Sequence, residues 1–202
     1  MAINQVVALH EGNGLYKYYV DKIKNASDDD LVIIARGDKN RKDEKYPPIY
    51  EKHNIYFYVA YKIEDALAFI VSPTDEQIAK AKQNMINSAR MCSMFTFLSG
   101  MGSSKTIDSW EYDESDPMVI VTTEGFCNGA GVLYCNEIFH ELYSKIGDYY
   151  ILPSSIHELI IIKKAHGMRT MDLNGLVHSV NIDTVSDHEY LADKAFNYLD
   201  WA

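Results

Sequence analysis

The chain has 202 residues, of which 47% are hydrophobic and 12% are aromatic. A chain of this size and composition can bury a sizeable core without metal or disulfide support, which excludes an intrinsically disordered protein. The formal charge is −10 at pH 7, and the pI is about 5.1. Because an acidic surface repels a phosphate backbone, we expect no nucleic-acid partner.

Signals for targeting and for redox chemistry are few. The three cysteines, Cys92, Cys127 and Cys135, form neither a paired framework nor a metal-binding motif, and no cofactor is indicated. No apolar run reaches the roughly 20 residues that span a bilayer. Residues 1–10 lack the basic leader and the long apolar run of a secretion signal. We therefore expect a cytoplasmic protein, in a cell or in an infected host, with no membrane partner and an oligomeric state that the sequence leaves open.

The first quarter of the chain, residues 1–53, is interpreted as a small N-terminal lobe. Loose alternation indicates a short strand over 3–9, and a stripe of apolar residues predicts a helix over 12–26. A compact apolar run predicts a buried strand over 31–35. A charged loop then leads to Pro47-Pro48, which ends regular structure.

An α+β core is expected over 54–202, and it begins with a β-hairpin. Aromatic and β-branched residues predict a strand over 54–61, followed by a partner over 66–71. Ser72 is interpreted as the cap of a helix that runs to about Leu98. Its inner face is expected to carry Ile78, Ala81, Met85, Ala89 and Cys92.

The middle of the core alternates polar and apolar segments. The stretch 103–116 is polar and acidic, with Trp110 as its large anchor, and predicts a surface excursion. Apolar runs predict strands over 117–122 and 129–134, and Gly125 is free to take a positive φ in the turn between them.

The last third predicts two helices around a second hairpin. Asn136 is interpreted as the cap of a helix that Gly147 closes, and strands are expected over 149–152 and 159–162. Thr170 is interpreted as the cap of the last long helix. Its expected inner face comprises Leu173, Leu176, Val177 and Val180. After it come a capping box at Ser186-Asp-His-Glu189 and an edge strand within 194–201.

Strands come mostly in adjacent pairs, with helices between the pairs. This order predicts an α+β fold, with a largely antiparallel sheet and helices packed against it, in a single compact domain that includes the small N-terminal lobe.

The C-terminal part resembles a known family. The motifs that carry the resemblance occur in a fixed order: Asp116–Thr123, Asn128–Tyr134, Ile138–Gly147, Tyr150–Ile160, Asn181 and Leu191–Tyr198. Together they resemble the C-terminal half of a bacterial family known as domain of unknown function 5688, over roughly residues 64–200. Leu-Pro-Ser-Ser-Ile-His-Glu at 152–158 is the most specific part. The resemblance implies a prokaryotic or phage origin and a shared fold, and it implies no chemistry.

The joint of the second hairpin contains a cluster of side chains that are capable of catalysis. Ser154, Ser155, His157 and Glu158 stand within five residues, so a small hydrolase with Ser155 as nucleophile and His157 as base is one hypothesis. On an extended chain Ser155 and His157 share one face while Glu158 turns away, and the Gly-x-Ser-x-Gly elbow is absent. The favoured interpretation is a tight turn whose hydroxyls bond nearby backbone groups.

Two further sites are weaker hypotheses. His140 and His157, each followed by a glutamate, supply metal-ligand types without the His-Glu-x-x-His spacing. Cys135 precedes the helix over 136–146, which would lower its thiol pKa, although a small apolar filler is the favoured interpretation.

The sequence therefore favours a non-catalytic binding or regulatory module of a bacterium or its phage, which acts through protein–protein contact. The 15 tyrosines and the acidic surface suit a protein partner better than nucleic acid. The alternative is the small hydrolase.

Overall fold

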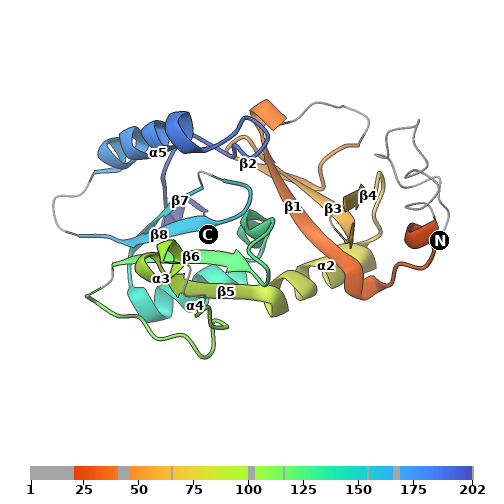
Figure 1. Ribbon diagram of the computed structural model, residues 1–202, viewed down its shortest axis with the longest axis horizontal. Helices are drawn as coiled ribbons and strands as arrows, with labels where there is room; N and C mark the ends of the chain where they lie inside the picture. Colours follow the sequence, from red (N-terminus) through yellow and green to blue (C-terminus); the bar gives the residue numbers. More distant parts are fainter. Residues whose placement is uncertain are drawn as a thin grey trace.

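Two antiparallel sheets and the helices around them make up the fold (Figure 1). The computed structural model describes residues 21–40, 46–64, 66–99, 103–115, 117–153, 155–165 and 169–201. Its helices are η2 (Asp28–Asp30), η3 (Asp38–Asn40), α2 (Asp75–Ser88), α3 (Met94–Leu98), η4 (Gly129–Tyr134), α4 (Asn136–Ile146), α5 (Thr170–Thr184) and α6 (Tyr198–Trp201). Its strands are β1 (Leu31–Gly37), β2 (Tyr50–Lys52), β3 (Ile55–Ile63), β4 (Ala66–Phe69), β5 (Ala89–Ser93), β6 (Met118–Thr123), β7 (Tyr149–Leu152), β8 (Leu159–Lys163) and β9 (Phe196–Asn197). The predicted α+β class with antiparallel pairing in one compact domain is confirmed. The expected strand over 3–9 and most of the expected helix over 12–26 lie outside the described residues.

The first sheet is built on β3, which pairs with β1, β2 and β4. The predicted hairpin is confirmed, because Ile63 stands opposite Ala66 and Glu64 takes a φ of 54° in the turn. The strands β1 and β2 come from the predicted lobe over 1–53, and both pair with β3 in this sheet.

The second sheet has the strand order β5-β6-β8-β7-β9, and every neighbouring pair is antiparallel. The strands predicted over 117–122, 149–152 and 159–162 correspond to β6, β7 and β8. The expected edge strand within 194–201 is present only as the short β9, because α6 begins at Tyr198.

The prediction of one helix from Ser72 to Leu98 is correct only for its first part, because α2 ends at Ser88. Thr74, rather than Ser72, caps α2 through reciprocal hydrogen bonds with Gln77. The residues after α2 form β5 and pair along β6, with Met91 at the centre of the ladder. Apolar residues here suit either a helical face or a buried strand, and pairing with a distant strand decides between them.

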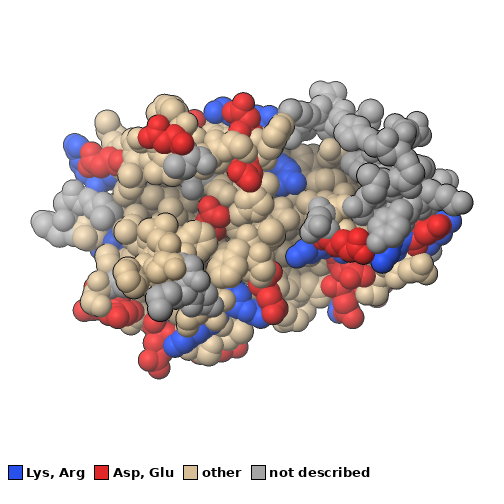
Figure 2. All heavy atoms as spheres, viewed as in Figure 1, with Lys and Arg blue, Asp and Glu red and all other residues tan. Residues whose placement is uncertain are grey.

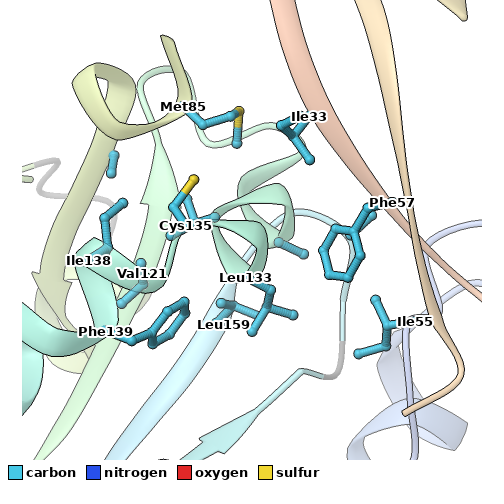
Figure 3. Packing of buried hydrophobic residues seen from close by; sticks show 14 of the residues in the cluster. Ile33, Ile55, Phe57, Met85, Val121, Leu133, Cys135, Ile138, Phe139 and Leu159 are labelled. Atoms are coloured by element: carbon cyan, nitrogen blue, oxygen red, sulfur yellow. The ribbon is translucent and has the colours of Figure 1, made fainter. Parts of the chain in front are cut away.

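The strand expected over 129–134 is also wrong, because this segment is the 3₁₀ helix η4. It lies against both β1 and β6, so it forms a wedge between the two sheets (Figure 3). A Cβ on Gly131 would lie 2.0 Å from the carbonyl oxygen of Ile33, and one on Gly129 would lie 2.4 Å from that of His157. The small residues permit close backbone approach, as the sequence indicated, but in a helical turn.

The helices cover the sheets largely as predicted. The inner face of α4 buries Ile138, Phe139, Leu142 and Ile146 in the main core, which also takes side chains from both sheets (Figure 3). The helix starts at the expected place, but Cys135 rather than Asn136 is its N-cap.

In the last long helix, α5, the N-cap position is Arg169 rather than Thr170, and the Arg169 side chain makes no capping hydrogen bond. Leu173 and Val177 are buried as expected. Leu176 was expected to point inward, but it is 49% exposed and lines a cleft beside α5.

Candidate functional site

The second sheet is apolar on both of its faces. Alternate residues of β7 and β8 point into the main core, and those between them, such as Leu152 and Ile162, join a second cluster under α5. Ile120 of β6 and Ile160 of β8 lie on the same outer face. An outer face of this composition needs a covering layer, and α5 and α3 cover it only in part.

A groove of about 620 Å³ remains between these two helices. Its floor is the outer face of β6, β8 and β7, and its walls are the side chains of α3 and α5. Leu98 on one wall is 75% exposed, and Leu176 on the other is 49% exposed. Figure 2 shows this face of the molecule, where the hollow between α5 and α3 is mainly tan, with acidic atoms at its inner end. The volume is typical of a ligand-binding cleft.

The inner end of the groove is polar, and it contains the connection between β7 and β8. Ser155, His157 and Glu158 of this connection line the groove together with Glu189. The structure thus brings the predicted Ser155, His157 and Glu158 together at the inner end of a cleft, whereas Ser154 lies outside the described residues.

Backbone hydrogen bonds hold this connection from two sides. On one side the carbonyl of His157 accepts from the N–H of Gly129 at 2.9 Å and from the hydroxyl of Thr122 at 2.8 Å. On the other side the N–H of Ile156 donates to the carbonyl of Glu189 at 2.8 Å. The positions of the side chains are therefore set by η4, β6 and the segment around Glu189.

The hydroxyl of Ser155 takes part in a local turn. Its oxygen accepts a hydrogen bond from the backbone N–H of His157 at 2.9 Å, and the side chain also hydrogen-bonds to the Glu158 carboxyl. Ser155 is 5% exposed. This is the arrangement of a serine turn, in which the hydroxyl replaces a backbone acceptor.

Both ring nitrogens of His157 have partners other than Ser155. Nδ1 lies 3.3 Å from the backbone N of Asn128 and accepts its hydrogen, so the neutral ring carries its proton on Nε2. Nε2 lies 3.4 Å from Oε1 of Glu189. A hydrolytic pair requires a serine hydroxyl that donates to the lone pair of the imidazole, and here a backbone N–H occupies that lone pair.

The two carboxyl groups give the groove its negative end. Burial raises the pKa of Glu158, Glu189 raises it further, and the Ser155 hydroxyl and His157 offset part of this shift. Glu189 also accepts from the Ser186 hydroxyl at 3.0 Å, which fixes its second carboxylate oxygen. Among the described residues that line the groove, none is a lysine or an arginine.

The other predicted sites do not assemble. His140 is exposed on α4, where its Nδ1 lies 2.8 Å from the carbonyl of Asn136. In the part of the chain that the structure describes, no three His, Cys, Asp or Glu side chains are placed to hold a metal ion. The weaker hypothesis of a lowered thiol pKa at the helix start is not supported, because burial raises the pKa of Cys135 to about 12, and the buried side chain fits the favoured interpretation of an apolar filler.

Sequence reasoning missed most of the groove. It placed Leu98 near the end of a longer helix, counted Leu176 as a core residue, and treated Glu189 only as part of a capping box. The available signal was the apolar content of β6, β7 and β8 on both faces, which exceeds what one core can cover.

This geometry defines the class of the protein as α+β, with an apolar cleft between two helices. The chain belongs to the family described as "Family of unknown function (DUF5688)", whose model matches residues 60–199. The predicted resemblance is thereby confirmed. No curated protein and no solved structure matches the chain. Over the described residues, the structure contains no helix with the length and hydrophobicity to cross a membrane.

Proposed function

We propose that this protein is a non-catalytic binding module of a bacterium or its phage, which acts in the cytoplasm through protein–protein contact. The groove between α3 and α5 is its docking surface. The single observation that carries the proposal is the groove of about 620 Å³ over the second sheet. Its floor is an uncovered apolar strip of the sheet, and both of its walls carry exposed apolar side chains. Exposed apolar surface of this kind marks interaction sites on proteins that are otherwise polar outside.

The site chemistry supports binding over hydrolysis. A nucleophile needs a free route to its base, and the Ser155 hydroxyl bonds instead to the backbone of His157 and to Glu158. The His157 ring has a backbone donor at Nδ1 and a carboxylate at Nε2. These contacts indicate that the connection between β7 and β8 supports the inner end of the groove.

A charge on either groove wall tests the proposal. Leu98→Asp and Leu176→Asp place a carboxylate in the cleft, and Leu199→Asp is the matched control, since Leu199 is 66% exposed on α6 and does not line the groove. Because all three leucines are exposed, we expect each variant to fold with little loss of stability.

The readout is direct binding of a purified partner, first found by affinity capture from the native host and mass spectrometry. We expect both groove variants to weaken binding at least tenfold, with the Leu199→Asp variant unchanged, because a buried uncompensated charge is costly. A purified partner that binds all variants equally would remove the groove from the function. Covalent labelling of Ser155 by a fluorophosphonate, absent in Ser155→Ala, would establish the hydrolase instead.

A further inference from the structure

The groove is a gap in a layer of helices. On the outer face of the second sheet, α5 lies along one side and α3 along the other, and the residues that the structure describes leave the strip of β6 and β8 between them uncovered (Figures 1 and 2). Apolar strips of a sheet in α+β proteins are covered by the apolar face of a helix. The shape of the gap therefore suits one more helix.

Other modes of peptide recognition fit this surface less well. Strand addition uses a free sheet edge, whereas the groove lies over the face of β6, β8 and β7. Proline-rich segments dock between aromatic rings, and Phe97 is the one aromatic side chain among the described groove residues. A helix that lays its apolar face into the groove requires only aliphatic walls, which Leu98, Leu176 and Val177 provide.

The charge at the inner end indicates what this helix carries. Glu158 and Glu189 face the groove, and the described lining residues include no lysine or arginine to balance them. An occupant that covers these carboxylates removes water from them, which costs free energy unless the occupant brings a cation. An acidic occupant, such as a fatty acid or an anionic peptide, would meet like charges.

We propose that the groove binds an amphipathic helix of a protein partner, with a Lys or Arg at one end of its apolar face that pairs with Glu158 and Glu189. This inference rests on the proposed docking function of the groove and deepens it by specifying the chemistry of the partner. The apolar side chains fill the cleft, and the cation sets the direction in which the helix lies.

Synthetic helices test the proposal without the natural partner. The probes are fluorescein-labelled peptides of about 16 residues, long enough to form a helix, with Leu at i, i+3, i+4 and i+7. One pair of peptides carries Lys at either end of the apolar face, and the matched peptides carry Gln or Glu there. Binding is measured by fluorescence anisotropy to the wild type, Glu189→Gln, Leu176→Asp and the control Glu51→Gln, which lies exposed on β2 of the other sheet.

We expect one Lys peptide to bind about tenfold more tightly than its Gln counterpart, because a charge-assisted contact at a partly buried site is worth about that factor. Glu189→Gln should weaken this preference, because only Glu158 then remains to pair with the cation, and Glu51→Gln should keep it. Leu176→Asp should weaken every peptide.

The failures of the two proposals are distinguishable. Equal affinity for Lys, Gln and Glu peptides, all weakened by Leu176→Asp, would overturn the proposed pairing of a cation with Glu158 and Glu189. It would leave the groove as the docking surface. Peptide binding that Leu176→Asp does not weaken would overturn the groove itself. A dimer in sedimentation velocity that Leu176→Asp abolishes would assign the groove to a second copy of the chain and refute a helical partner.

Discussion

Replacing Ser155 by alanine separates a structural hydroxyl from a catalytic one. The variant removes the acceptor of the His157 N–H, at 2.9 Å, and the partner of the Glu158 carboxyl. Ser155 is 5% exposed, so water cannot fully take the place of the hydroxyl. Leaving such a donor unsatisfied costs about 1–3 kcal/mol, and we expect a loss of about 2 kcal/mol in the free energy of unfolding.

Urea unfolding followed by tryptophan fluorescence measures this loss. With a slope of about 2 kcal/mol/M, the midpoint should fall by about 1 M while the slope stays the same. The matched control is Ser179→Ala, because Ser179 is exposed on α5, and this variant should stay within about 0.5 kcal/mol of the wild type. If Ser155→Ala were as stable as the control, the hydroxyl would not hold the connection, and our argument for its structural role would be refuted.

Two further predictions concern the wedge and the acidic end of the groove. Gly131→Ala places a Cβ 2.0 Å from the Ile33 carbonyl oxygen, so it should lower the free energy of unfolding by about 3 kcal/mol and the melting temperature by about 9 °C. Its control is Gly175→Ala in α5, where the added Cβ has no atom within 4 Å, and this variant should raise the free energy of unfolding by about 0.5–1 kcal/mol. Equal changes in stability of the two variants in calorimetry would contradict the role of η4 as a wedge. The pKa of Glu158 is raised in the folded state, chiefly by burial, so its contribution to stability is present below its unfolded pKa of about 4.3 and is lost as pH rises through the folded value. Relative to Glu158→Gln, the wild type should therefore lose stability in urea titrations as pH rises from about 4.3 through the folded pKa, and parallel pH profiles would count against this.

The amino-acid sequence by itself determined the antiparallel α+β class and most of the strands. Aromatic and β-branched runs at 54–61 and 159–162 have few alternatives to a buried strand, and the adjacent pairs they form need only short turns. The family could also be predicted, because Leu-Pro-Ser-Ser-Ile-His-Glu at 152–158 is a local and specific motif. Ser155, His157 and Glu158 were found for the same reason, since they lie within a few residues of one another.

The tertiary structure decided the elements whose local signals are ambiguous. Residues 89–93 are compatible with a continued helix, and their pairing with β6 makes them a strand. Residues 129–134 are compatible with a strand, and the close approach of their glycines to the backbones of Ile33 and His157 occurs instead in a helical turn. It also decided the roles of the polar residues, because Asn128 and Glu189 approach His157 only in the folded chain. The groove has the same origin: its floor, its two walls and its acidic end come from segments far apart in the sequence, and local patterns report the apolar content of each segment but not which faces remain uncovered when they pack.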